Sequence, residues 1–235
     1  MISFEELERN YRQVQEKTAE AAIKSGRAPE DVLLLPVTKT QSVETLEMAY
    51  RLGMRVCGEN RVQEILQKKP VLPGDLVFHL IGHLQKNKVR QILGQVELIH
   101  SVDSFGLAEV IEKEAVKKGL EADVLVEINA GEEASKFGTS LAQTEALVRQ
   151  IATLPHVHVK GLMTVAPYVA DPEENRKVFQ DMHHIYVDIQ DKNIDNVSMS
   201  VLSMGMTNDY EVAISEGANL VRVGTGIFGA RQYTV

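Results

Sequence analysis

The residue best placed to do chemistry in this sequence is Lys39, which closes the apolar segment LLLPVTKT over Leu33–Thr40. An apolar run of this length predicts a buried parallel strand with its last polar residues at the carboxyl end. Ligands of α/β folds gather at that end of the strands, because the loops that follow converge there. An amine there can attack a carbonyl group and form a Schiff base. Position alone also allows a solvated lysine that simply ends a strand.

Two glycine-containing turns add a second kind of chemistry. Residues 203–207 read SMGMT and follow a predicted strand, and residues 222–226 read RVGTG at the end of the last predicted strand. Glycines let the backbone approach an anion closely, and amides and hydroxyls can then donate hydrogen bonds to it. The first turn also runs into a helix that we expect Asn208 to cap. In barrels, phosphate sites often follow strands seven and eight, so these turns predict a phosphate cup.

A phosphate cup beside a lysine predicts a phosphorylated carbonyl compound held as a Schiff base. Pyridoxal phosphate is the first candidate, and a sugar-phosphate aldolase intermediate is the alternative. Arg222 favours the first, because a protonated guanidinium would keep a pyridine nitrogen unprotonated and weaken the cofactor as an electron sink. The other interpretation of Arg222 is a salt bridge to an acidic partner inside the barrel.

The elements that must bring these residues together alternate between strands and helices along the chain. Eight strands that are apolar throughout, rather than alternating between apolar and polar residues, indicate a parallel sheet that is covered on both faces or closed into a barrel. A long helix from Ser3 to Gly26 precedes them. We therefore predict a TIM-type (β/α)8 barrel with an extra N-terminal helix, as one domain over residues 1–235, with a doubly wound open sheet as the alternative. The predicted strands are Leu33–Thr40, a short strand through Val56, Val77–Ile81, Glu97–Val102, Asp123–Ile128, His158–Met163, Val197–Leu202 and Leu220–Val223.

Composition narrows the choice of partners and compartment. The chain has 235 residues and a formal net charge of -8 without a long Lys or Arg run, which argues against nucleic acid. No long apolar window or leader-like start is present, so we expect a cytoplasmic protein without a membrane segment. The single cysteine, Cys57, is interpreted as core packing. His156 and His158 have the spacing of metal ligands on one strand face, yet no third ligand is evident and no metal site is predicted.

Eight motifs in chain order carry a resemblance to a known family. They read LLLPVTKTQ, CGENRVQE, FHLIGHLQKNK, HSVDS, INAGEEASKFG, KGLMTV, LSMGMTNDYEVAI and VRVGTGIFGAR, from about Leu33 to Arg231. Together they resemble the pyridoxal phosphate homeostasis protein family (YggS/PROSC type), which shares the barrel of the alanine racemase N-terminal domain. Two departures are Phe78, where the family commonly has Trp, and the start of the loop AGEEASKFG.

The resemblance implies a fold-type III pyridoxal phosphate barrel and assigns a role to several residues. It implies that Lys39 forms the internal aldimine, that Arg222 faces the pyridine nitrogen and that Asn60 lies close to the ring. It also implies that the phosphate is held by Ser203, Gly224 and Thr225, with Met204 and Thr207 nearby. Lys136 would be a second amine used in cofactor traffic; from its place in a polar loop we expect a solvated lysine instead.

The expected function is binding and delivery of pyridoxal phosphate, not turnover of a substrate. The family is associated with balancing pyridoxal phosphate and amino-acid or keto-acid pools, which implies apo-enzymes and amino acids as partners. Racemases with this barrel carry a second, β-rich domain and borrow a catalytic tyrosine from a partner subunit, whereas this sequence ends at Val235. We expect an open mouth that excludes water poorly and holds no second acid–base group. The alternative is a single-domain amino-acid racemase, and we expect a monomer.

Overall fold

Eight parallel strands form one sheet in the structure, a computed structural model that describes residues 2–131, 133 and 136–230. Their order across the sheet is β1-β8-β7-β6-β5-β4-β3-β2. The strands from β2 to β8 are therefore neighbours in chain order, and the first strand, β1, pairs with the last, β8. The strands are β1 (Leu33–Pro36), β2 (Val56–Glu59), β3 (Val77–Leu80), β4 (Leu98–Val102), β5 (Ala122–Ile128), β6 (Val157–Thr164), β7 (Val197–Ser203) and β8 (Leu220–Val223).

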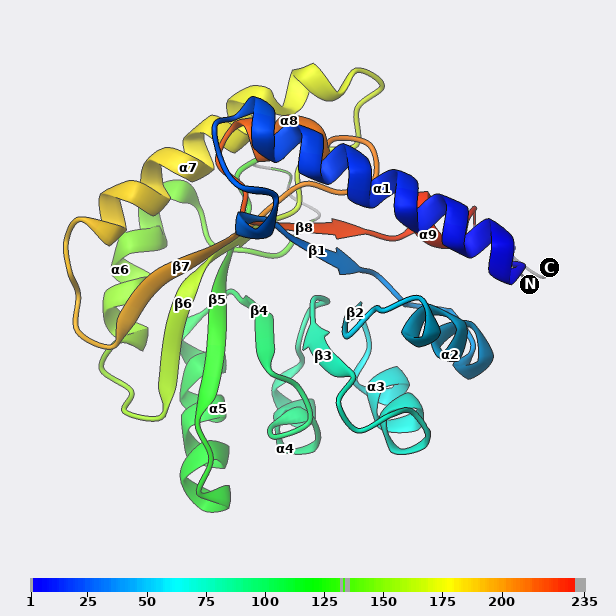
Figure 1. Ribbon diagram of the computed structural model, residues 1–235. Coiled ribbons are helices and arrows are strands. Elements are labelled where there is room, and N and C mark those ends of the chain that lie inside the picture. The colour runs from blue at the N-terminus through cyan, green and yellow to red at the C-terminus, as the bar shows by residue number, and fades with distance from the viewer. Residues whose placement is uncertain (1, 132, 134–135, 231–235) are drawn as a thin grey trace.

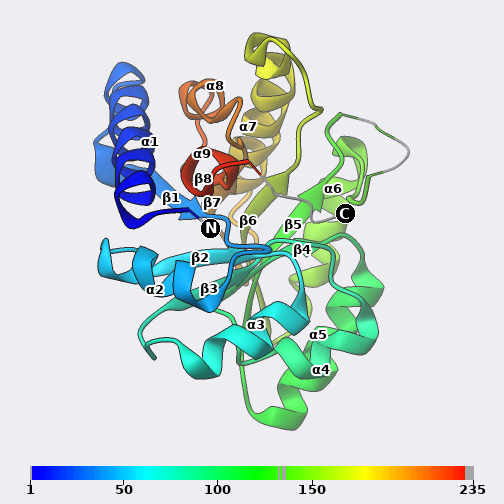
Figure 2. The same cartoon turned by 90° about the vertical axis from the view of Figure 1, so that its right-hand side faces the viewer.

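The sheet closes between β1 and β2. Val37, just past β1, forms a parallel bridge with Gly58 on β2, and the N–H of Thr38 donates to the Gly58 carbonyl at 2.9 Å. The result is a nearly closed barrel, which Figures 1 and 2 show from two sides. The predicted barrel is therefore confirmed, and the doubly wound open sheet is not what the chain forms.

Side chains alternate between the inside of the barrel and the helices around it. Leu98, Leu125 and Met163 pack together as a small cluster inside the barrel. Their strand neighbours, such as Val124 and Val126, belong to the much larger apolar cluster between strands and helices. The interior is thus filled partly by apolar side chains, and the remaining inward positions carry polar ones.

Helices surround the barrel, and several begin at the signals that predicted them. Ser3 and Ser42 each accept a hydrogen bond from a backbone N–H of the first helical turn, and Gly119 ends its helix at φ 63°. The helices are α1 (Phe4–Lys24), α2 (Val43–Arg51), α3 (Val62–Lys68), α4 (Val89–Ile92), α5 (Phe105–Lys118), α6 (Leu141–Ile151), α7 (Arg176–Gln190), α8 (Tyr210–Ser215) and α9 (Thr225–Phe228), with 3-10 turns η1 (Pro29–Asp31), η2 (Lys69–Val71), η3 (Lys86–Lys88) and η4 (Pro172–Asn175). The extra helix α1 packs outside the barrel against α8 and α9 (Figure 1).

Two helices at the end of the chain differ from the sequence-based expectation. Asp209, rather than Asn208, is the N-cap of α8, and its side chain accepts no hydrogen bond from the helix; the Asp209 Oδ1 accepts instead from the N–H of Met206 in the preceding turn, at 2.7 Å. The short α9 was not predicted, since four residues are too few for an apolar period to appear.

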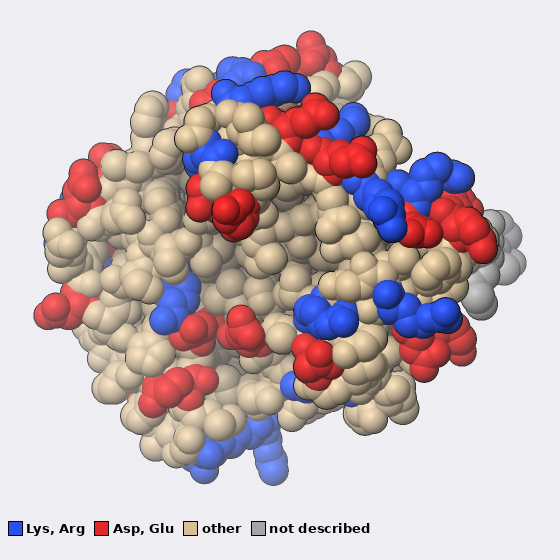
Figure 3. All heavy atoms as spheres, viewed as in Figure 1, with Lys and Arg blue, Asp and Glu red and all other residues tan. Residues whose placement is uncertain are grey.

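The surface carries both signs of charge. On the face shown in Figure 3, Lys and Arg side chains lie among Asp and Glu side chains around a largely uncharged centre. Within the part of the chain that the structure describes, no helix is both long enough and apolar enough to cross a membrane.

Candidate functional site

A cavity of about 550 Å³ lies at the carboxyl end of the barrel strands. Six of the residues predicted to form the site line it: Lys39, Asn60, Thr207, Arg222, Gly224 and Thr225. The rest of its wall is formed by Val37, Ile81, Val165, Pro167, Tyr168, Val169, Met206, Asn208 and Asp209. The strand ends thus bring together the amine, the guanidinium and both glycine turns, although they are far apart in the sequence.

Lys39 is half-buried in the turn that follows β1. Both of its chain neighbours are hydrogen-bonded to carboxylates. The Thr38 hydroxyl donates to the Glu59 Oε1 at 2.8 Å, and the Thr40 N–H donates to the Glu64 Oε2 at 2.8 Å. Thr40 also has φ 66°, a left-handed conformation that a threonine adopts only where its surroundings impose it. The backbone that presents Lys39 is therefore held on both sides.

A buried lysine joins these two carboxylates. Lys68 on α3 places its Nζ 2.7 Å from the Glu59 Oε1 and 2.8 Å from the Glu64 Oε2, and its side chain is 8% exposed. Burial raises the pKa of Glu59, and the Lys68 ammonium opposes that rise. Sequence reasoning missed this cluster. The helical spacing of Glu64 and Lys68 could have suggested their pairing, but nothing in the sequence indicates that Lys68 also contacts Glu59 and the Thr38 carbonyl.

The two glycine turns meet as predicted. The hydroxyl of Thr225 donates to the hydroxyl of Thr207 at 3.2 Å, and the N–H of Gly226 donates to the same Thr207 oxygen at 3.3 Å. Gly205 makes the first turn possible, because it has φ 90° and a Cβ there would lie 2.6 Å from the Cβ of Ala213. Two hydroxyls and the backbone of the second turn therefore border the same part of the cavity.

Arg222 lies in the wall of the cavity and is 4% exposed. Its Nη1 donates to the Ser203 hydroxyl at 2.5 Å and its Nη2 donates to the Thr164 carbonyl at 2.6 Å. Burial lowers the pKa of Arg222 to about 10, so the guanidinium stays charged at neutral pH. Among the described residues no carboxylate lies within ion-pair distance of it, which does not fit the salt-bridge interpretation.

Ser203 and Met204 are fully buried and are not among the residues that line the cavity. The Ser203 hydroxyl points into the barrel, where it contacts Arg222 and the His100 Nδ1, the latter at 3.1 Å. Phosphate binding by these two residues stays a prediction, and the Met204 N–H already donates to the Leu220 carbonyl at 3.2 Å. Sequence reasoning could not tell which of the hydroxyls in the SMGMT turn faces the cavity, because the turn interrupts the strand alternation.

Asn60 lines the cavity and carries an unsatisfied polar atom. Its Oδ1 is buried and has no hydrogen-bond partner among the described residues. The backbone around it is tightly packed, since a Cβ on Gly82 would lie 2.3 Å from the Asn60 carbonyl oxygen. A buried acceptor without a donor costs free energy, and a ligand that donates to it would remove that cost.

Lys136 is not the solvated loop lysine that we expected. Its side chain is 25% exposed, its Nζ pairs with Glu133, and the same ammonium donates to the Ala166 carbonyl at 3.1 Å. The loop that carries it is thereby joined to the segment after β6 that borders the cavity. Residues 132, 134 and 135, which include part of the variant loop start, lie outside the described residues, as does Arg231.

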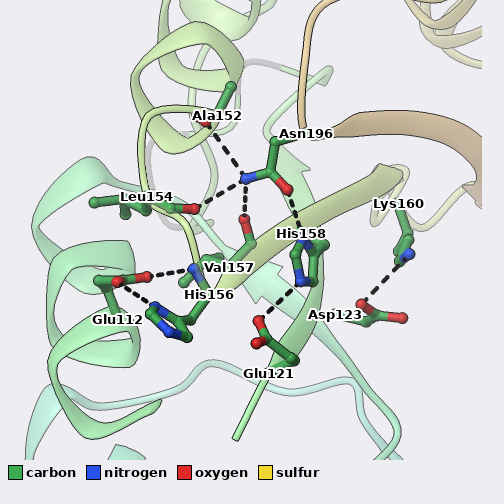
Figure 4. A network of polar contacts seen from close by, with 10 residues as sticks. All are labelled: Glu112, Glu121, Asp123, Ala152, Leu154, His156, Val157, His158, Lys160 and Asn196. Atoms are coloured by element: carbon green, nitrogen blue, oxygen red, sulfur yellow. Dashed lines mark hydrogen bonds and ion pairs between the residues drawn. The ribbon is translucent and has the colours of Figure 1, made fainter. Parts of the chain in front are cut away.

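The two histidines considered as metal ligands have separate partners (Figure 4). The His156 Nδ1 lies 2.8 Å from the Glu112 Oε1, whereas the His158 Nδ1 contacts the Asn196 Oδ1 at 2.5 Å and its Nε2 contacts the Glu121 Oε2 at 3.0 Å. Within the described residues, no group of three or more side chains is arranged to hold a metal ion. The pair therefore acts as hydrogen-bonding groups near the start of β6.

The buried cysteine fits the sequence interpretation. Cys57 lies on β2 in the apolar core, and burial raises the pKa of its thiol to about 12. A thiol with such a pKa stays protonated at neutral pH and is a poor nucleophile. Cys57 therefore contributes packing to the barrel.

Comparison with known proteins identifies the family. The model of the alanine racemase N-terminal domain matches residues 2–232. The pyridoxal phosphate homeostasis protein of Aquifex aeolicus is 42% identical over 221 residues, which cover 94% of this chain and 96% of that protein. The protein of the same name from Escherichia coli K12 is 33% identical, over 97% of this chain and 98% of its own length.

Solved structures agree with the sequence comparison. The structure of PipY from Synechococcus elongatus with pyridoxal phosphate bound has a TM-score of 0.78 and 33% identity, covering 92% of this chain and 100% of that one. An alanine racemase from Clostridium difficile has a TM-score of 0.77 at 16% identity, covering 98% of this chain and 58% of its own, which shows the shared fold. By sequence and by fold, the chain belongs to the pyridoxal phosphate homeostasis protein family, whose barrel is that of the alanine racemase N-terminal domain.

Proposed function

We propose that this protein binds pyridoxal 5'-phosphate in the cavity, holds it as a Schiff base on Lys39, and releases it as part of intracellular pyridoxal phosphate homeostasis. The observation that carries the proposal is that one cavity is lined by Lys39, Arg222 and residues of the two glycine turns. The names of the relatives and the pyridoxal phosphate in the PipY structure support it. A location in the cytoplasm and a monomeric state are predictions from the sequence.

The residues present fit this cofactor. Thr207, Gly224 and Thr225 would hold the phosphate, since their hydroxyls and backbone border one end of the cavity. Arg222, a fixed and charged donor, would face the pyridine nitrogen. The Asn60 Oδ1, buried without a partner among the described residues, would gain a donor or a polar neighbour. When bound, pyridoxal phosphate supplies an aldehyde that an amine captures reversibly.

The same cavity supports a carrier better than a racemase. A racemase needs a second acid–base group, and besides Lys39 and Arg222 the titratable side chains among the described lining residues are Tyr168 and Asp209. Tyr168 is 93% exposed, so nothing positions its hydroxyl. Both Asp209 oxygens accept hydrogen bonds, one from the Met206 N–H and one from the Asn175 side chain. The racemase alternative would depend on Tyr168.

The test is the visible spectrum of the purified protein with added pyridoxal phosphate. The parent should gain a Schiff-base band that borohydride removes, and peptide mass analysis should place the reduced adduct on Lys39. Lys39→Ala should lose the band, while Lys117→Ala, a control on an exposed helix face, should keep it. A band in Lys39→Ala, or an adduct elsewhere, contradicts the proposed anchor.

A second assay separates the carrier from the enzyme. The loaded protein should transfer pyridoxal phosphate to an apo-enzyme and leave the enantiomers of free amino acids unchanged. Racemisation that disappears in Tyr168→Phe would establish the alternative.

A further inference from the structure

A chain of buried hydrogen bonds leads from Arg222 into the barrel. We propose that Ser203, His100 and His79 are positioning residues that fix the Arg222 guanidinium through a one-way hydrogen-bond chain in which both histidines are neutral and protonated on Nε2. The chain is a property of the protein alone, and its effect on the cofactor rests on the proposed function.

The chain crosses the barrel from β8 to β3. The Arg222 Nη1 lies 2.5 Å from the Ser203 Oγ, which lies 3.1 Å from the His100 Nδ1, and the His100 Nε2 lies 3.0 Å from the His79 Nδ1. His100 and Ser203 are fully buried, and His79 and Arg222 are each 4% exposed. Water is therefore excluded from these contacts, and each polar atom must find its hydrogen-bond partner within the chain.

The direction of hydrogen-bond donation along this chain is set by Arg222. A guanidinium only donates, so the Ser203 Oγ accepts from Arg222. The Ser203 hydroxyl hydrogen then has one acceptor within hydrogen-bonding distance among the described residues, which is the His100 Nδ1. A nitrogen that accepts carries no proton, so His100 is protonated on Nε2 and donates to the His79 Nδ1. By the same argument, His79 is protonated on its own Nε2.

This assignment requires both imidazoles to be neutral, and their surroundings agree. Burial lowers the pKa of His79 to about 4. Burial also lowers the pKa of His100 well below its ordinary value, with smaller contributions from His79 and from the Arg222 charge. Because both imidazoles are neutral, the positive charge of this hydrogen-bond chain stays on the Arg222 guanidinium.

Arg222 is anchored at a second point, which completes the fixing of its plane. Its Nη2 donates to the Thr164 carbonyl at 2.6 Å, and Thr164 is itself held because its hydroxyl donates to the Ile128 carbonyl at 2.7 Å. With one N–H on each terminal nitrogen engaged, the plane of the guanidinium is fixed beside the cavity that Arg222 lines. A ligand atom opposite it must then be an acceptor.

The proposal gives Ser203 a different task from the phosphate contact that the family resemblance implies. Its hydroxyl accepts from Arg222 and donates its one hydrogen to His100, so no donor is left for a phosphate oxygen. The hydroxyl that borders the cavity from the same turn belongs to Thr207. Ser203 therefore acts through Arg222, and Thr207 is the hydroxyl available to an anion.

The first experiment uses the protein without added pyridoxal phosphate. Long-range proton–nitrogen NMR correlations distinguish the two neutral tautomers and the charged form of histidine, and the seven histidines can be assigned by single substitutions. We expect the Nε2–H tautomer at His79 and His100. Ser203→Ala should change the His100 nitrogen shifts and leave those of the exposed His184 in place. An Nδ1–H tautomer or a charged ring at His100, or His100 shifts that do not respond to Ser203→Ala, overturns the chain.

The second experiment measures pyridoxal phosphate affinity by absorbance titration. His100→Asn keeps an acceptor near the position of Nδ1, whereas His100→Leu removes it. We expect roughly tenfold weaker binding in His100→Leu and in Ser203→Ala, and a smaller loss in His100→Asn. The nitrogen-15 shift of the labelled pyridine ring should also move in His100→Leu and return toward the parent value in His100→Asn.

Controls keep the two proposals separable. Thermal unfolding of each variant shows whether it is folded at the temperature of the titration. Parent affinity and parent pyridine shift in both folded His100→Leu and Ser203→Ala overturn the positioning role. If the parent itself does not bind pyridoxal phosphate, the proposed function fails, and the tautomer measurement still decides whether the chain exists.

Discussion

The Nζ of Lys68 lies 3.0 Å from the carbonyl oxygen of Thr38, the residue directly before Lys39. The same ammonium pairs with Glu59 and Glu64, whose oxygens accept hydrogen bonds from Thr38 and from the residue after Lys39. The buried Lys68 thus holds the turn that carries Lys39. Such clusters are costly to bury. Removing one member strongly destabilises the folded protein, because the other members are left buried and unpaired.

Lys68→Met should destabilise the folded protein by about 3–5 kcal/mol, since it leaves the fully buried Glu59 carboxylate without a counter-ion. The measurement is the free energy of unfolding in urea at pH 7. Lys117→Met is a matched control, because Lys117 is an exposed lysine that pairs with Glu114 on its own helix, and it should cost at most about 1 kcal/mol. Equal losses in the two variants would show that the Lys68 cluster has no special role.

Gly205→Ala should destabilise the protein by more than about 1 kcal/mol and weaken pyridoxal phosphate binding. The position has φ 90°, and the added Cβ would lie 2.9 Å from the Tyr210 Cα, so the turn that carries Thr207 must shift. Gly74→Ala is the control, since a Cβ there meets nothing within 4 Å. Thermal unfolding and cofactor titration of both variants provide the comparison, and a Gly205→Ala protein that matches Gly74→Ala contradicts the strained turn.

The sequence was sufficient to predict that Lys39 and Arg222 lie at one end of the barrel, because that depends on strand ends. Lys39 follows the first apolar run and Arg222 lies on the last, and the parallel pairing of β1 with β8 makes those strands neighbours. Periodicity and turn residues are local properties, so they can be read without coordinates.

What the sequence could not supply was the direction of side chains and the pairing of distant ones. Ser203 and Thr207 belong to one turn, yet one hydroxyl faces Arg222 inside the barrel and the other borders the cavity. The contact of Lys68 with Glu59 joins a helix to a strand, and His100 meets Ser203 across the barrel. These contacts depend on how the barrel closes, which no local pattern encodes.

Glu127→Gln should stabilise the protein relative to the parent by an amount that grows as the pH rises. Burial, with a smaller contribution from Asp103, raises the pKa of Glu127 to about 7, above the ordinary value that it has when unfolded. Between those two values the folded state binds more protons than the unfolded state, so the parent loses stability with rising pH, by up to about 3 kcal/mol. Glutamine resembles the protonated acid and does not titrate. Urea unfolding of both proteins at pH 5 and pH 8 tests this, and a constant difference contradicts it.

His100→Asn should make the protein less sensitive to acid. The pKa of His100 is depressed in the folded state, so between that value and about 6.5 the unfolded chain binds a proton that the folded protein excludes, and stability falls as the pH falls. Asparagine removes this contribution. His156 provides a control of opposite sign, because its hydrogen bond with Glu112 raises its pKa and stabilises the protein at low pH, with that stabilisation lost as the pH rises. Unfolding free energies at pH 7 and pH 5 should therefore converge in His100→Asn and diverge in His156→Ala, and the same trend in both variants would contradict the neutral buried imidazole.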